Sequence, residues 1–290
     1  MQQVSRRTFL ETSAAATALA LSSQTVRAAA GDKMGYGLVT YLWGQDWDLP
    51  TLIANCEKSG ALGVELRTTH AHGVESTLND KQRAAVRDRF ADSDVTLVGI
   101  GSNERYDNPD PAVVKKAIDA TKDFIRLSHD VGSTGVKVKP DRFYPDVPRE
   151  KTIEQIGKSL NELGKYAEGF GQQIRLEVHG QCRELPTIRA IMDIADNHNV
   201  AVCWNSNAAD LEGGGLEHNL ALVRDRFGAT CHVRELDSPE YPYQQLIDLL
   251  VKSDYAGWIL LESSSKPADK VAALARQVAL FEQMVKKAQG

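Results

Sequence analysis

Eight short apolar runs recur along this chain, and segments with a helical pattern separate them. The runs span residues 37–43, 62–68, 95–101, 134–139, 174–179, 200–205, 229–236 and 257–262. The intervening segments carry apolar residues at three- and four-residue spacing, for example in 113–131, 153–167 and 271–285. Parallel strands need crossover helices between them, so this alternation predicts an all-parallel sheet that closes into a single (β/α)8 TIM barrel.

Proline and glycine positions agree with this fold. Asp110-Pro111 and Leu185-Pro186 are typical helix starts. Residues 31–290 have the size of one α/β barrel domain, and no linker divides them. A doubly wound open sheet is the alternative fold, but the chain lacks the glycine-rich dinucleotide turn that such sheets carry. The glycine-rich segment 210–215 lacks the Lys and Ser/Thr of a phosphate-binding loop, which favours a turn that enters a helix.

The first thirty residues have the pattern of an export signal. Arg6 and Arg7 precede the uncharged, apolar-rich stretch 12–22, and residues 28–30 are three alanines that suit a signal peptidase. The arginine pair resembles a twin-arginine translocation signal, which implies export of a folded protein to the periplasm. The apolar stretch is too short to span a bilayer core of about 30 Å, so no stable membrane span is expected.

Charge and cysteine content narrow the class of partner. The formal net charge is -5, with both signs interspersed, and this argues against a nucleic-acid surface. The four cysteines show no metal-binding spacing. Cys203 and Cys231 lie inside apolar runs, where buried free thiols are expected rather than disulfides. A small molecule is therefore the expected partner, and an oligomer is compatible with the sequence.

Barrels of this kind carry their chemistry at the carboxyl ends of the strands. Four of the seven histidines gather at those ends. The residues that end the runs or follow them are Tyr41, Trp43, Arg67, His70, His72, Ser102, Asn103, Glu104, Lys137, Lys139, Glu177, His179, Asn205, Asn207, His232, Arg234, Glu235 and Glu262. Alternation along a strand places Glu177 with His179, and His232 with Arg234, on the same side.

Two glutamates stand out because each follows a run of Leu or Ile. A charge buried alone is costly, so Glu177 and Glu262 must be paired or functional. The structural alternative for Glu177 is a buried ion pair with Lys137 or Lys139. Structural roles are also open for other candidates. His70 and His72 are compatible with loop positions that have no functional task, and Trp43 either closes the barrel top or forms a platform for a sugar ring.

In this order on eight strands, these residues resemble the xylose isomerase-like TIM barrel superfamily, which includes sugar isomerases, epimerases and related lyases. The segments that carry the resemblance are 175–180, 201–205, 232–237 and 257–262. The resemblance implies a divalent metal held by Glu on the fifth strand, Asp on the sixth, His on the seventh and Glu on the eighth, with the two glutamates also serving as bases. Glu177 and Glu262 match the first and last of these positions.

The middle two positions depart from the pattern. Asn205 and Ala208 stand where the resemblance implies Asp and a companion His, and Arg234 stands where it implies the metal-binding His, with His232 two residues earlier. Asn still offers a carbonyl oxygen, but Arg is a permanent cation that repels a metal. The sequence therefore favours no metal, or a weakly held one.

Three functions follow from these residues. The first is a sugar isomerase or epimerase whose Mn²⁺, Zn²⁺ or Mg²⁺ is held by Glu177 and Glu262 with His179 or His232, and with Asn205 as a further ligand. The second is the same reaction without metal, in which Arg234 with Lys137 or Lys139 stabilises an enediolate. The third is an exported sugar-binding barrel that catalyses nothing.

The sequence favours an enzyme, because two strand-end glutamates, two lysines and an arginine exceed what recognition needs. The expected catalytic residues are Glu177, Glu262, Arg234 and Lys137. The expected substrate is a free or oxidised sugar, and elimination from a keto-sugar is the alternative chemistry. The expected substrate contacts are Trp43, His70, His72, Lys139, His179, Asn205, Asn207, His232 and Glu235.

Overall fold

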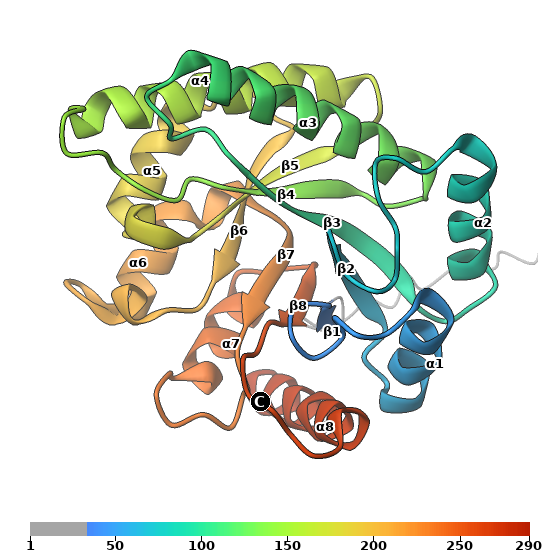
Figure 1. Cartoon of the computed structure of the whole chain (residues 1–290). Helices are drawn as coiled ribbons and strands as arrows, with labels where there is room; N and C mark the ends of the chain where they lie inside the picture. The colour runs from blue at the N-terminus through green and yellow to red at the C-terminus, as the bar shows by residue number, and fades with distance from the viewer. Residues whose placement is uncertain (1–33) are drawn as a thin grey trace, which may run out of the picture.

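The computed structural model of the protein describes residues 34–290, so the predicted export signal lies outside the described residues. Eight parallel strands close into a barrel in sequence order, as predicted (Figure 1). The strands are β1 (Gly35–Val39), β2 (Gly63–Arg67), β3 (Thr96–Arg105), β4 (Gly135–Lys139), β5 (Gln173–Glu177), β6 (Val200–Asn205), β7 (Phe227–Val233) and β8 (Trp258–Leu261). The single (β/α)8 TIM barrel is confirmed, and the open sheet is excluded.

Within residues 34–290, eight α-helices surround the strands, as can be followed in Figure 1. They are α1 (Leu49–Ser59), α2 (Asp80–Ala91), α3 (Pro111–Asp130), α4 (Arg149–Glu168), α5 (Leu185–Ile194), α6 (Gly215–Val223), α7 (Tyr243–Lys252) and α8 (Lys270–Ala288). Three short 3-10 turns are η1 (Gly180–Cys182), η2 (Ala208–Leu211) and η3 (Arg224–Arg226). Both predicted helix starts are confirmed: Asp110 caps α3 by accepting the N–H of Ala112, and α5 begins at Leu185.

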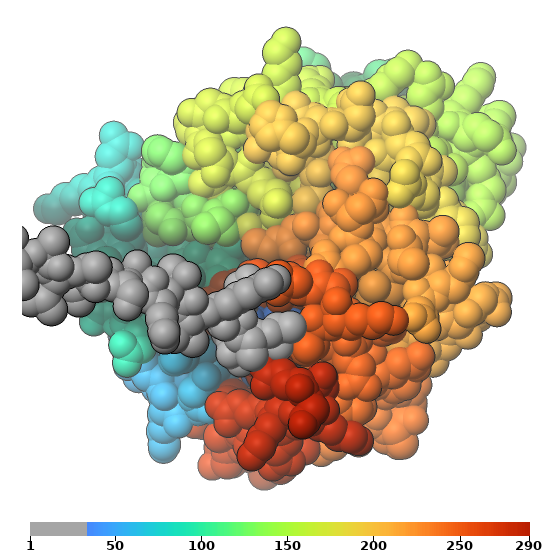
Figure 2. All heavy atoms as spheres, turned by 180° about the vertical axis from the view of Figure 1, so that it is seen from behind, coloured from blue at the N-terminus to red at the C-terminus, as the bar shows by residue number. Residues whose placement is uncertain are grey.

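The barrel closes where β1 pairs with β8, with Gly35 opposite Trp258. Glycine is needed at this seam, because a Cβ atom on Gly35 would lie 2.4 Å from the Trp258 ring. Outside the seam, α1 and α8 are neighbours, and the view from behind shows the red end of the chain beside the blue beginning (Figure 2). The first and last strands and helices of residues 34–290 therefore pack side by side and close the barrel.

The apolar core has two parts. The larger one lies between strands and helices. A small separate cluster of Val39, Val98 and Leu260, packed by Trp258, lies on three strands. The strand pairing aligns Glu65 with Val39 and His232 with Leu260, so these polar side chains share the inner face of the barrel with that cluster. Charged groups therefore occupy the barrel interior.

Several strands end elsewhere than the sequence predicts. β1 ends at Val39, before Tyr41 and Trp43, and β7 ends at Val233, before Arg234. β3 runs on to Arg105. All four cysteines are buried free thiols, as expected for Cys203 and Cys231. None of the helices within residues 34–290 is long and apolar enough to cross a membrane.

Candidate functional site at the carboxyl ends of the strands

Three side chains from three strands converge inside the barrel: Glu177 at the end of β5, His232 on β7 and Glu262 just after β8. The Nδ1 atom of His232 lies 3.7 Å from an oxygen of Glu177 and 3.6 Å from an oxygen of Glu262. One donor atom from each residue lies within 4.8 Å of the other two. Glu177 and His232 have no exposed surface, whereas the Glu262 side chain is 17% exposed. Solvent or substrate therefore reaches the cluster from the Glu262 side.

Glu177 is held by polar partners on both of its oxygens. Lys137 Nζ lies 2.7 Å from Oε2, Lys139 Nζ lies 3.9 Å from it, and the Asn205 amide donates a 2.7 Å hydrogen bond to Oε1. Burial alone would raise the pKa of Glu177, but Lys137, His232 and Lys139 outweigh burial and hold it well below its usual range. The buried ion pair that the sequence suggested as an alternative is therefore present, inside the same cluster.

Glu65 on β2 is a third acidic group in this cluster, and it is absent from the residues predicted above. It is fully buried, and its Oε1 lies 3.4 Å from His232 Nε2. The sequence signal for it is the one that marks Glu177, an acidic residue beside apolar residues of a strand. Burial opposes its ionisation, but His232, Lys137 and Arg175 outweigh burial and lower the pKa of Glu65.

The two candidate residues at the end of β7 differ in their positions. His232, and not Arg234, lies beside Glu177 and Glu262. His232 is on the inner face of the barrel, but β7 ends one residue later and alternation no longer fixes the direction of Arg234. Arg234 is exposed and forms no ion pair with any residue of 34–290, while its backbone N–H bonds to the Tyr243 hydroxyl. The structure does not bring Arg234 to the carboxylates.

His179, which follows β5, lies in a second polar chain next to the cluster. Its Nδ1 lies 2.8 Å from Asp141, and its Nε2 lies 3.4 Å from Lys139 Nζ. Asp141, another residue absent from the sequence predictions, also pairs with Arg105 at 2.6 Å. Burial and the neighbouring Lys137 charge lower the pKa of Lys139. His179 is thus linked to Glu177 through Lys139. Among residues 34–290, the candidate metal-binding group consists of Glu177, His232 and Glu262 and does not include His179.

The two histidines after β2 differ from each other. Both ring nitrogens of the buried His72 are used by backbone, with Nε2 facing Arg67 O and Nδ1 accepting from Val74 N–H. His70 is half-buried and contacts the Thr40 hydroxyl at 2.9 Å. Burial and the Arg67 charge lower the pKa of His70 to about 4, so it is neutral near pH 7. The two backbone contacts of His72 indicate that this side chain stabilises the loop after β2.

The remaining predicted contacts hold loops together. Trp43 is almost completely buried and its indole N–H donates to Ser265 O, which favours closure of the barrel top over a sugar platform. Asn207 caps η2, since its side chain accepts the Ala209 N–H. Glu235 accepts a hydrogen bond from Ser263 in the segment after β8. These residues shape the rim of the site.

The cluster fits a divalent cation. A histidine nitrogen and two carboxylates are donors that suit Mn²⁺, Zn²⁺ or Mg²⁺. Both ring nitrogens of His232 are buried without a hydrogen-bond partner, which is an unusual cost unless another group satisfies them. The fourth position differs from the expected set, because Asn205 turns its amide N–H₂ toward Glu177 and Ala208 has no donor atom. Glu177, His232 and Glu262 therefore form a three-residue candidate metal site.

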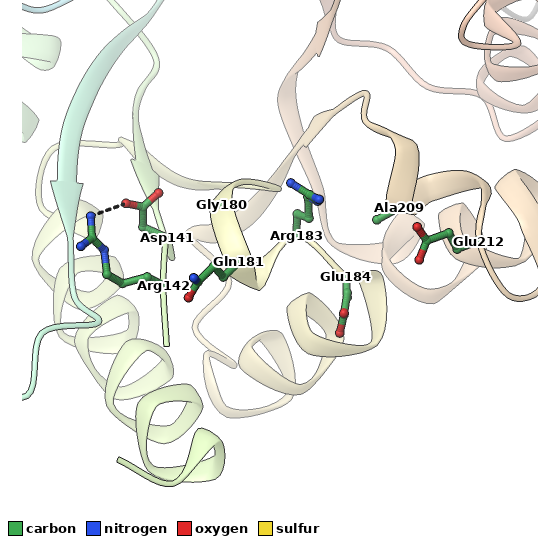
Figure 3. Close-up of a pocket in the computed structure, with 8 residues that line it drawn as sticks. All are labelled: Asp141, Arg142, Gly180, Gln181, Arg183, Glu184, Ala209 and Glu212. Carbon is green, nitrogen blue, oxygen red and sulfur yellow. Dashed lines mark ion pairs between the residues drawn. The ribbon is translucent and has the colours of Figure 1, made fainter. Parts of the chain in front are cut away.

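A cavity of about 600 Å³ lies over the ends of β4, β5 and β6 (Figure 3). Asp141 and Arg142 form one side of it and Ala209 and Glu212 the opposite side. Between them lie Gly180, Gln181, Arg183 and Glu184. Its lining is mostly polar and charged. Because Asp141 also contacts His179, the cavity borders the polar chain that leads through Lys139 to Glu177.

A family profile described as xylose isomerase-like TIM barrel matches residues 53–283 of this chain. The chain belongs to this family. The match includes Glu65, Glu177, His232 and Glu262, so the whole cluster lies within the family domain. No curated protein sequence matches the chain.

Solved structures share the fold of this xylose isomerase-like barrel. One is the apo form of 3-keto-D-glucoside 4-epimerase, YcjR, from E. coli, with 14% identity, a TM-score of 0.73, and coverage of 86% of this chain and 99% of the other. Another is an L-ribulose 3-epimerase, with 16% identity, a TM-score of 0.75, and coverage of 87% and 95%. A third is the IOLI protein with a bound zinc atom, with 16% identity, a TM-score of 0.72, and coverage of 88% and 99%.

Proposed function

We propose that this protein is a sugar epimerase or isomerase that moves a proton on a carbon next to a carbonyl group. The observation that carries the proposal is the convergence of Glu177 and Glu262 on one nitrogen of His232. Two carboxylates on either side of a substrate are what removal and return of a proton require. The two epimerases that share this fold, named for a keto-glucoside and for a ketose, support the same substrate class.

Glu262 is the base that a substrate reaches first, because it is the partly exposed member of the cluster. Its carboxylate accepts the proton as the C–H bond breaks, and the electron pair passes to the carbonyl oxygen to give an enediolate. A proton then returns to the opposite face of the same carbon in an epimerase, or to the neighbouring carbon in an isomerase.

Glu177 serves the second face in this proposal. It stays ionised because Lys137 and Asn205 hold its two oxygens. Before Glu177 returns a proton to this face, it has to take one up from solvent, because the carboxylates around Lys137 raise the pKa of that lysine and keep it a cation. The positive charge of Lys137, whose Nζ lies 2.7 Å from Glu177, stabilises the negative charge that develops. Roles of Asn205, Lys139 and His179 in contacting substrate hydroxyl groups belong to the same proposal.

Glu177, His232 and Glu262 would hold the divalent cation, which when bound supplies positive charge that polarises the substrate carbonyl. The metal-free form of the reaction is the second candidate. The positions of the Lys137 and Lys139 ammonium groups beside Glu177 favour it. It has to proceed without Arg234, which does not reach the carboxylates.

The predicted export signal supports a periplasmic enzyme that meets free or oxidised sugars. Elimination from a keto-sugar starts with the same proton removal, so it remains within the proposal. A barrel that only binds sugar is the alternative, and the test below separates it from an enzyme.

The test is exchange of sugar protons for deuterium in D₂O, followed by NMR over a panel of ketoses and 3-keto-glycosides, with and without added Mn²⁺. We expect exchange by the wild-type protein, and a loss of about 10²–10⁴-fold in Glu177→Gln and in Glu262→Gln. Glu162→Gln is the matched control, since Glu162 lies on the surface in a pair with Lys122. Tight sugar binding without exchange would support the binding protein, and undiminished exchange in both variants would remove the two glutamates from catalysis.

A further inference from the structure

His232 faces acidic groups on both sides of its ring. Its Nδ1 lies 3.6–3.7 Å from Glu262 and Glu177, and its Nε2 lies 3.4 Å from Glu65 Oε1. The two ring nitrogens point in different directions, so Glu65 lies on the side of the ring away from the candidate metal site. Glu65 is therefore the acidic group that determines whether Nε2 carries a proton.

The barrel interior is shaped around Glu65. A Cβ atom at Gly99 would lie 3.1 Å from Glu65 Oε2, and one at Gly101 would lie 2.8 Å from Oε1. Glycine at both positions of β3 leaves the space that this carboxylate fills. Glu65 is fully buried, and neither of its oxygens has a hydrogen-bond partner among residues 34–290. A buried carboxylate without a donor is costly, and His232 Nε2 is the ring nitrogen beside it.

The nearby cations do not account for Glu65. Arg175 donates to Gln173, Val98 and Thr134, which fix all three of its guanidinium nitrogens. Lys137 is paired with Glu177 at 2.7 Å. Both cations favour a charged Glu65, but neither is hydrogen-bonded to it, and this leaves its oxygens for the imidazole.

We propose that Glu65 is a positioning residue that accepts the Nε2 proton of His232 and so directs Nδ1 toward the space between Glu177 and Glu262. Histidines that bind metals commonly donate their other ring N–H to a carboxylate, which fixes the tautomer and makes the ligand nitrogen more basic. Glu65 thereby sets how tightly a divalent cation is held. This inference rests on the metal site of the proposed function.

The first measurement is the Mn²⁺ affinity of the full-length protein, determined by calorimetry without any substrate. We expect Glu65→Gln to weaken Mn²⁺ binding by about 10–100-fold, because the neutral amide makes His232 less basic. Asp107→Asn is the matched control: Asp107 is also a buried carboxylate, it contacts Arg142 rather than the cluster, and Mn²⁺ affinity should stay within about twofold of wild type. Wild-type affinity in a folded Glu65→Gln protein would overturn the proposal.

The second measurement does not depend on metal or on activity. In ¹⁵N-histidine NMR spectra of the metal-free wild-type protein, Nε2 of His232 should carry a proton, whether the ring is neutral or charged. An unprotonated Nε2 would overturn the role of Glu65, and Glu65→Ala should change this nitrogen's signal more than Asp107→Asn does. If the wild-type protein binds no Mn²⁺, the metal part of the proposed function fails, and the spectrum still decides the role of Glu65.

Discussion

Glu177 keeps its charge in a fully buried position because positive and polar groups surround both of its oxygens. Removing one partner of such a buried pair leaves the other charge uncompensated, which costs more than the net worth of the pair. The same groups hold the carboxylate in the orientation that the proposed reaction uses. Stability and function therefore depend on the same contact between Lys137 and Glu177.

We expect Lys137→Met to lower the free energy of unfolding by about 3–5 kcal/mol, because Glu177 then lies buried without its main partner. The double variant Lys137→Met/Glu177→Gln should recover most of this loss, as measured by urea denaturation. Because the pKa of Glu177 is lowered, the stabilisation is present above its usual pKa and disappears as pH falls toward the lowered value. Lys122→Met, which removes a surface ion pair, is the control, and additive effects of the two buried substitutions would contradict the coupling.

The segment after β6 is an element that a single buried acid organises. Asp210 accepts hydrogen bonds from the Tyr241 hydroxyl and from both the backbone and the side-chain amide of Asn207. Asn207 in turn donates to Asn205 O. The amides that end this strand thus build a turn, and Asn205 alone among them reaches Glu177.

Burial raises the pKa of Asp210 to about 7, although its hydrogen bonds oppose the shift. The folded state therefore binds a proton that the unfolded state has already released, and this group's contribution to stability falls as pH rises from about 4 to about 7. Asp210→Asn should remove that slope in urea denaturation across this pH range. Asp193→Asn, a surface acid paired with Arg189, should keep it, and an unchanged slope in Asp210→Asn would contradict the assignment.

At the scale of the whole molecule, closure of the barrel brings together acids that lie far apart in the chain. Glu65 comes from β2, Glu177 from β5 and Glu262 from the end of β8. In an open sheet with this strand order, β2, β5 and β8 would lie several strands apart, so these side chains could not form the cluster. A cation held by Glu177, His232 and Glu262 would therefore connect β5, β7 and the end of β8.

We expect saturating Mn²⁺ to raise the melting temperature of the wild-type protein, since a ligand of the folded state stabilises it by about 2.7 kcal/mol at 100 times its dissociation constant. For a domain of this size, that corresponds to about 5–10 °C. Glu262→Ala should abolish the shift, because it removes the carboxylate that closes the site. Addition of a chelator is the control, and an equal shift in Glu262→Ala would place the cation elsewhere.

The sequence was sufficient for the architecture. Eight apolar runs separated by helical periodicity could fit few other folds, and the predicted helix starts at Pro111 and Leu185 hold to the residue. Strand ends were less predictable. The run at 229–236 ends with the apolar Leu236, so Arg234 and Glu235 before it looked like strand residues although β7 ends at Val233.

By itself, the sequence determined the barrel, the end of the barrel that carries the polar groups, and the positions of Glu177 and Glu262 at the ends of their strands, because hydrophobic periodicity and isolated charges are local properties of the chain. The tertiary structure decided which of the candidates meet. It placed His232 rather than Arg234 beside Glu177 and Glu262, and it placed Glu65 next to the other ring nitrogen of His232. The side chains of His72, Asn207 and Trp43 form hydrogen bonds with loop backbone. Those outcomes depend on register between strands and on side-chain direction after a strand ends, and neither is encoded in the spacing of one segment.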